Sequence, residues 1–147
     1  MNDTVQILQD LVRNTRTGRD AAEQLMHRSE SPRMRRELNL ERERYLALQR
    51  EAEKALRDAG GSPEPAGIMD RAGMKLGLEI NTLANRSDGH IAEMVIQGAT
   101  MGIIEMTKSM NACAEADPSA RSLASHFIVQ QNEFIERQKS YLQTQRV

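Results

Sequence analysis

The chain has 147 residues, the usual size of a single domain, and its 20 Lys and Arg residues nearly cancel its 21 Asp and Glu residues, leaving a formal charge of -1. Such a balance gives no electrostatic footprint for nucleic acid or an anionic membrane, and no apolar run approaches the ~20 residues of a membrane-spanning helix. Aromatic residues make up only 3% of the chain, with no Trp, which disfavours a β-sandwich or an α/β enzyme and favours helices. We therefore expect one all-α domain over residues 1–147, with neither nucleic acid nor a membrane as its partner.

The single cysteine, Cys113, excludes an internal disulfide and a thiolate metal cluster, so a reducing cytoplasm fits best. No histidine lies near it in the sequence to activate it, and we expect a buried structural thiol. Residues 1–10 alternate polar and apolar side chains and lack both the basic leader and the apolar core of a signal peptide. The expected location is therefore the cytoplasm.

Residues 2–27 carry apolar side chains at intervals of three and four, the period of an amphipathic helix. Ser31 followed by Pro32 marks the start of a second helix, because the serine oxygen can accept a free amide and proline at the first helical position loses no hydrogen bond. This helix is predicted over residues 32–59 and stops at the pair of glycines that follows. The short turn between the two helices makes them a hairpin.

Residues 60–67, GGSPEPAG, form the one evident linker, since two prolines and three glycines cannot continue a helix. A shorter helix is predicted over residues 68–84, and residues 85–89 interrupt the chain again. Two more long helices follow, over residues 89–116 and 118–145, separated by an Asp-Pro pair that repeats the signal of a cap followed by proline.

The helices are thus long, long, short, long and long, and this order constrains the topology. Tight turns join the first pair and the last pair of long helices as antiparallel hairpins, each long helix measuring roughly 40 Å at about 1.5 Å per residue. The middle connection, residues 60–88, is too long for a tight turn but suffices to carry the chain back along the molecule. Four long helices with one long crossover have the topology of ferritin-like bundles.

The segment over residues 85–117, NRSDGHIAEMVIQGATMGIIEMTKSMNACAEAD, and the small-residue patch over residues 14–22 resemble the ferritin-like superfamily. Within it, the chain is similar to a bacterial family of ferritin-related domains of unknown function, and the helix order extends the likeness over nearly the whole chain. The resemblance implies an antiparallel four-helix bundle with a short extra helix in the crossover between the second and third long helices.

Metal-binding members of that superfamily place one Glu on each of two helices and a Glu-x-x-His on each of the other two. Two close cations need several carboxylates for charge and histidines to complete their coordination. This sequence departs from the pattern, because the residues three positions before His27, His90 and His126 are Gln, Ser and Leu. The di-metal ligand set is therefore incomplete.

Polar residues nonetheless interrupt the inward faces of the predicted helices. The carboxylates are Glu23, Glu41, Glu105 and Glu133, and the neutral residues include Tyr45, Gln97, Gln130 and Gln131. One interpretation is that the four glutamates converge to hold one or two hard cations. The preferred interpretation is that Glu41 pairs with Arg19, or forms hydrogen bonds with Tyr45 and the glutamines, as a polar remnant that fixes helix register.

Small and flexible side chains could also carry function. Glycines four residues apart at 98–102 and at 73–77 let another backbone approach closely, and tight internal packing is preferred over a dimer interface as their explanation. The nine methionines could line an adaptable groove, although their helical spacing favours core filling.

No phosphate-binding loop, CxxC pair or supported Ser/His/Asp set occurs, so nucleophilic catalysis and nucleotide hydrolysis have no support. We expect a non-enzymatic bundle with a structural or protein-interaction role and no cofactor, paired as a homodimer. The alternative is a carboxylate-rich protein that binds iron or another divalent cation, for storage or as an oxidase, through Glu23, Glu41, Glu105 and Glu133. A third hypothesis places a small-molecule site between the helices, lined by methionines, and it requires an internal cavity.

Overall fold

The computed structural model describes residues 2–65 and 71–142, and this part of the chain is all-α. Without any strand, it contains five α-helices and one short 3-10 helix: α1 (Asp3–Arg28), α2 (Pro32–Asp58), α3 (Arg71–Asn81), α4 (Asp88–Ala112), α5 (Pro118–Gln138) and η1 (Lys139–Tyr141). The predicted all-α class is therefore confirmed for the described residues. No helix among them is long and apolar enough to cross a membrane.

Side-chain caps explain where α1 and α2 begin. Asn2 Oδ1 accepts the amide of Thr4 at 2.8 Å, and Ser31 Oγ accepts the amide of Met34 at 3.1 Å. Asp117 stands at the predicted cap of α5, but its side chain makes no capping hydrogen bond. Its amide instead donates to Thr4 Oγ1 at 2.8 Å, so the turn between α4 and α5 is tied to the start of α1.

The ends of α2 and α4 have different causes. Gly60, at φ 83°, turns the chain out of α2 as predicted, and the amide of Gly61 donates to the Leu56 carbonyl at 2.9 Å, closing the helix end. Helix α4 ends at Ala112 rather than at residue 116. Here Arg121 Nη1 donates to the Met110 and Cys113 carbonyls at 2.8 and 3.0 Å, which satisfies acceptors that a longer helix would have bonded to its own amides.

Two further boundaries differ from the predictions. Helix α3 ends at Asn81 rather than at residue 84, because its last turn tightens and the Leu83 amide donates to the Ile80 carbonyl at 3.2 Å. Helix α5 ends at Gln138 and continues as η1 instead of as an α-helix. The predicted start of the short helix at residues 68–70 and the predicted end of the last helix at residues 143–145 lie outside the described residues.

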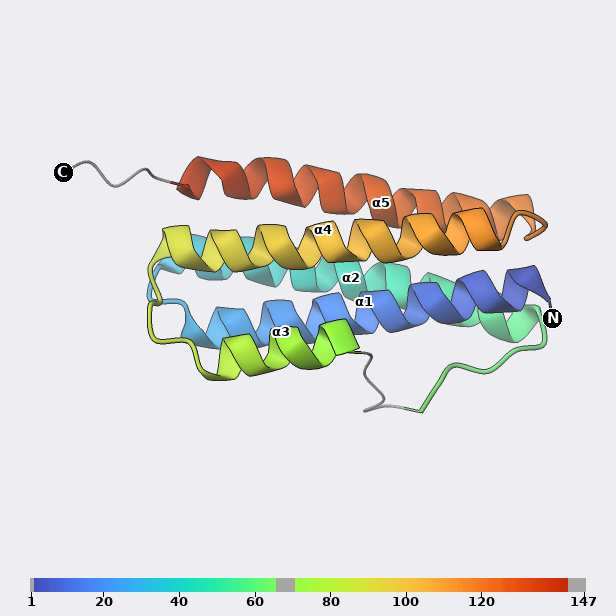
Figure 1. The fold of residues 1–147 in the computed structure, drawn as a ribbon, viewed down its shortest axis with the longest axis horizontal. Coiled ribbons are helices and arrows are strands. Elements are labelled where there is room, and N and C mark those ends of the chain that lie inside the picture. Colours follow the sequence, from blue (N-terminus) through green and yellow to red (C-terminus); the bar gives the residue numbers. More distant parts are fainter. Residues whose placement is uncertain (1, 66–70, 143–147) are drawn as a thin grey trace.

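The four longest helices, α1, α2, α4 and α5, lie side by side, and the short α3 runs along α1 (Figure 1). Helix α1 contacts α2 most extensively and also contacts α3, α4 and α5, whereas the second extensive pair is α4 with α5. Both extensive pairs are hairpins joined by short turns. The two hairpins therefore meet mainly through α1.

Buried apolar side chains form two separate clusters along the long helices. The first cluster joins the first half of α1 to the second half of α2 and includes Ile7, Leu8, Leu11, Leu48, Leu56, Met106, Cys113 and Phe127. The second cluster lies toward the other end and includes Leu25, Met34, Leu38, Ile80, Ile91, Met94, Val95 and Phe134. Cys113 is a buried free thiol, as predicted, and burial raises its pKa, which keeps it in the unreactive neutral form.

Candidate functional site

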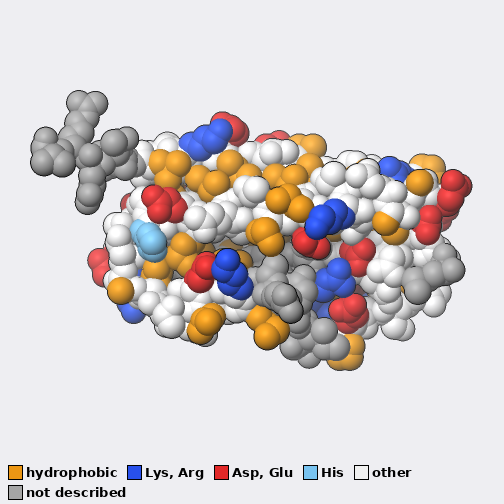
Figure 2. All heavy atoms as spheres, in the orientation of Figure 1, with side chains coloured by type: hydrophobic (Ala, Val, Ile, Leu, Met, Phe, Trp, Pro, Cys, Tyr) orange, Lys and Arg blue, Asp and Glu red, His pale blue; other side chains and the backbone are white. Residues whose placement is uncertain are grey.

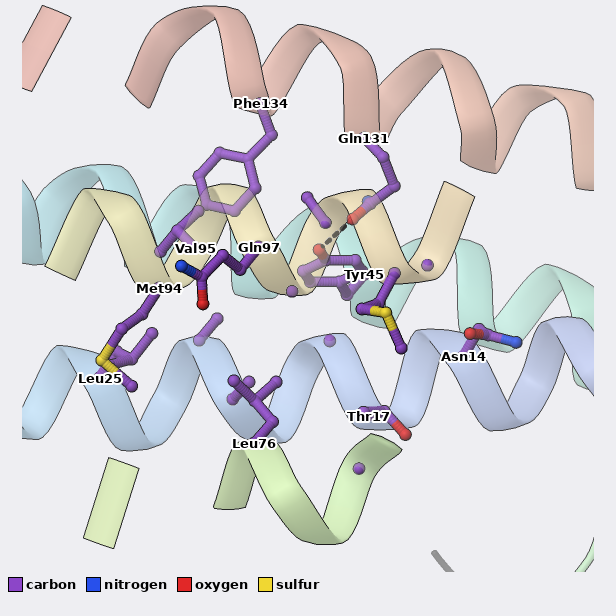
Figure 3. A pocket seen from close by; sticks show the side chains of 18 of the residues that line it. Asn14, Thr17, Leu25, Tyr45, Leu76, Met94, Val95, Gln97, Gln131 and Phe134 are labelled. Atoms are coloured by element: carbon purple, nitrogen blue, oxygen red, sulfur yellow. Dashed lines mark hydrogen bonds between the residues drawn. The ribbon is translucent and has the colours of Figure 1, made fainter. Parts of the chain in front are cut away.

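A pocket of about 160 Å³ lies between α1, α3 and α4, between the two apolar clusters. Its walls come from α1 and α4, and Leu76 of α3 covers one side. Its floor is made by side chains of α2 and α5, among them Leu38, Tyr45, Phe127, Gln131 and Phe134. Figure 3 shows these elements converging on one space, with Tyr45 and Gln131 on its inner side.

The pocket exists because both of its walls are built from small residues. Helix α1 contributes Gly18, Ala21 and Ala22, and α4 contributes Gly98, Ala99 and Gly102. No side chain longer than a methyl group projects from these six positions, so the space between the helices stays open. The third hypothesis from the sequence required an internal cavity, and the structure shows a pocket between the helices that is partly open to solvent.

The wall glycines make room for side chains rather than for another backbone. A Cβ atom added at Gly18 would stand 2.5 Å from ring carbons of Tyr45, and one added at Gly102 would stand 3.2 Å from Phe127 Cζ. At Gly98 the nearest atom would be a methyl carbon of Leu76 at 3.4 Å, an ordinary contact. Two aromatic rings of the floor are therefore seated against glycines, and the Leu76 side chain of α3 lies beside Gly98 of α4.

The floor carries one buried polar pair. The Tyr45 hydroxyl donates to Gln131 Oε1 at 2.6 Å, and both residues are almost completely buried. Burial, and then the nearby Glu41 carboxylate, raise the pKa of Tyr45 strongly, so its hydroxyl remains a protonated donor. Gln131 Nε2 is buried and has no hydrogen-bond partner among the described residues. The polar part of the floor is thus uncharged.

Next to this pair lies a buried carboxylate. Glu41 is fully buried, and its Oε2 lies 3.0 Å from Arg137 Nη2 and 3.4 Å from Arg44 Nη1. Its Oε1 has no partner in the described part of the chain. Burial raises the pKa of Glu41, and the two arginines and the nearby Gln130 amide oppose this shift without cancelling it.

The prediction of which residues pair with Glu41 is partly wrong. Arg19 does not reach Glu41 but donates to Gln49 Oε1 at 2.9 Å and to Asp20 at 3.1 Å. The reason is helix register, because Arg19 stands across from a position two turns farther along α2. The carboxylate is neutralised instead by one arginine of its own helix and one of α5, neither of which the periodicity had singled out.

The four glutamates proposed as metal ligands point to different surroundings. Glu23 and Glu133 are exposed, Glu41 is enclosed between two arginines, and Glu105 is half-buried at the pocket. Within residues 2–65 and 71–142, no three His, Cys, Asp or Glu side chains form a group that could hold a metal ion. The geometry of the described residues thus does not assemble the alternative metal site.

No family model, curated protein or solved structure matches this chain. The likeness to the ferritin-like superfamily consequently rests on the sequence segments and the helix order alone.

The pocket itself had only a faint sequence signal. Glycine and alanine recur on one face of each wall helix, but the same pattern predicts close helix packing equally well. What distinguishes a pocket from a tight contact is whether bulky side chains from other helices hold the two walls apart. Tyr45 and Phe127 do so here, and only the tertiary structure places them.

Proposed function

We propose that the protein is a non-enzymatic, ferritin-like four-helix bundle that binds a small, mostly apolar molecule in the pocket between α1, α3 and α4. The observation that carries this proposal is the pocket itself, whose volume of about 160 Å³ resembles that of an engineered cavity of about 150 Å³ that binds benzene. Pockets that bind small molecules are mostly apolar, with a few polar groups that orient the ligand. The apolar walls and the Tyr45–Gln131 pair fit this description.

The arrangement of the helices supports the bundle in this proposal. Two long hairpins, α1 with α2 and α4 with α5, are joined by a connection that contains α3, as expected for a ferritin-like crossover. Figure 2 shows apolar side chains along α4 and in the hollow between α4 and α3, with charged side chains at its edge. In this proposal the crossover helix closes a binding site instead of a metal centre.

Binding is favoured over catalysis by the state of the floor residues. Tyr45 is the titratable residue on the pocket floor, and its raised pKa makes it a poor general base near neutral pH. Its proton is already donated to Gln131. These groups can orient a ligand through hydrogen bonds, but they are poorly suited to moving a proton.

Binding of small aromatic probes to the full chain tests the proposal. We expect benzene or toluene to shift NMR signals of pocket residues and to raise the thermal unfolding midpoint, because a ligand that binds only the folded state stabilises it. Ala99→Leu adds three carbons to the wall at a buried position and should abolish probe binding while raising stability by about 0.5–2 kcal/mol. Gly98→Ala, at the neighbouring position, adds only an ordinary contact and should leave binding intact.

Two outcomes would count against the proposal. If no probe binds to the unmodified chain, the pocket is a packing void. If probes bind equally well to Ala99→Leu, they occupy another place.

The protein-interaction role expected from the sequence remains a second proposal. It is supported by large apolar side chains that are half or more exposed on α3, Met74 at 61% and Leu78 at 64%, and by Met101 and Ile104 on α4, each at 43%. A partner that covered them would remove this area from water.

A further inference from the structure

We infer that the molecule held in the pocket is an amine, with an apolar ring in the pocket and an ammonium group bound by Glu105 at its mouth. This inference rests on the proposed binding function and names the chemical class of the ligand. It gives Glu105 a role other than the metal ligation considered from the sequence.

Glu105 is the least solvent-exposed carboxylate in the pocket lining. Its side chain is half-buried, whereas the other charged lining residues, Lys75 and Glu79 of α3, are exposed. A charge in a partly buried position interacts more strongly with a ligand than an exposed one, because less water screens it. Among the charged side chains of the lining, Glu105 therefore interacts most strongly with a ligand inside the pocket.

Among the described side chains, the Glu105 carboxylate also has no ion-pair partner. No hydrogen bond or ion pair joins it to any side chain that the structure describes, although Lys108 lies three positions later on the same helix. Most other half-buried carboxylates among the described residues are paired, as Glu64 is with Arg13 at 3.2 Å and Glu53 with Arg16 at 3.4 Å. A half-buried carboxylate in the lining of an apolar pocket, unpaired among the described side chains, is the arrangement that a cationic ligand group completes.

The rest of the lining suits the apolar ring and the size of such a ligand. Tyr45, Phe127 and Phe134 give the floor three aromatic rings, which suit an apolar ring and whose faces attract cations. By comparison with the benzene-binding cavity of similar volume, the pocket takes a body of about six to ten non-hydrogen atoms. An anion of the same shape would instead be repelled by Glu105.

Three probes of similar shape and different charge test the inference on the full chain. Phenethylamine carries an ammonium group, propylbenzene replaces its nitrogen with carbon, and phenylacetate carries a carboxylate. We expect NMR titration to give phenethylamine an affinity about tenfold higher than propylbenzene at low salt, and phenylacetate the weakest binding, as for a charge-assisted hydrogen bond that is partly desolvated. The preference for the amine should shrink as salt is added.

Two variants at the pocket mouth locate the interaction. Glu105→Gln removes the charge and should bring phenethylamine to the affinity of propylbenzene, while propylbenzene itself binds as before. Glu79→Gln removes an exposed carboxylate from the same lining and should keep most of the amine preference. Circular dichroism of both variants confirms that they are folded.

The outcomes separate this inference from the binding function on which it rests. If propylbenzene binds and Ala99→Leu blocks it, but phenethylamine binds no better or Glu105→Gln leaves the preference unchanged, the amine inference is overturned and the binding function stands. Tightest binding of phenylacetate would also overturn it and would point to Lys75. If none of the three probes binds, both proposals are overturned.

Discussion

Glu41 is the residue whose surroundings differ most from what its residue type requires. It is fully buried, yet only one of its oxygens meets the two arginines. Both arginines keep about a third of their side-chain surface in water, at 39% for Arg44 and 33% for Arg137, so they do not depend on Glu41 for solvation. The carboxylate is therefore the member of the group that burial penalises.

This imbalance has a consequence for stability against pH. Burial raises the pKa of Glu41 above its ordinary value of 4.5, so the folded protein holds this proton more tightly than the unfolded chain does. The resulting stabilisation is complete below the ordinary pKa and is lost as the pH rises through the folded one. We expect Glu41→Gln, which mimics the neutral acid, to gain stability relative to the unmodified protein as the pH rises from the ordinary carboxyl pKa of 4.5 toward neutrality.

Urea unfolding across this pH range measures the effect, and Glu43→Gln serves as the control. Glu43 lies on the same helix beside Arg42, but 56% of its side-chain surface is exposed, so its substitution should change little with pH. If the stability advantage of Glu41→Gln over the unmodified protein shrank as the pH rose, the arginines would stabilise the carboxylate more than burial opposes it.

At the scale of one element, α1 and α4 use glycine for different purposes. Gly18 of α1 lies under the buried Tyr45 ring, whereas Gly98 of α4 faces a Leu76 methyl carbon at ordinary contact distance. Both glycines lie inside helices, where alanine is intrinsically favoured by about 1 kcal/mol. Whether a Gly→Ala substitution raises or lowers the stability of the protein therefore depends on the space around each glycine.

Gly98→Ala is expected to stabilise the protein by up to about 1 kcal/mol, because the gain in helix propensity meets no obstacle. Gly18→Ala should destabilise it by about 1–3 kcal/mol, because the new Cβ would stand 2.5 Å from ring atoms that are packed in the core. Denaturant unfolding of the two variants side by side measures the difference. A stabilised Gly18→Ala would mean that the Tyr45 ring can move into the neighbouring pocket.

At the scale of the whole molecule, the state of association remains a prediction. Exposed apolar side chains on α3 and α4 accord with the homodimer expected from the sequence. We expect sedimentation velocity at micromolar concentration to give a species of twice the 16.6 kDa chain mass. A single species of the chain mass at all concentrations would contradict the homodimer.

The alternative function, metal binding, is also tested on the intact protein. Incubation of the purified chain with ferrous iron in air, followed by elemental analysis, measures bound metal. We expect no stoichiometric iron, because the side chains that the structure describes form no group of three ligands. Iron that disappears in Glu41→Ala would restore the carboxylate site.

Much of the helical architecture could be predicted because its signals are local. The three-and-four spacing of apolar residues predicted the long helices, and the Ser31-Pro32 and Gly60-Gly61 signals placed both boundaries of α2 within one residue. Where the end of a helix depended on a distant side chain, prediction failed. Arg121 satisfies the last carbonyls of α4, and no local pattern announces that contact.

The sequence by itself determined the all-α class, the order of long and short helices and the burial of Cys113, since helix period, caps and breakers act within a few residues of each other. Only the tertiary structure decided that Glu41 meets Arg137, that Glu105 lines a pocket and that the small residues of α1 and α4 enclose space. These features depend on which side chains from different helices stand at the same level. A rotation or slip of one helix by a single residue would change them while leaving the periodic pattern almost intact.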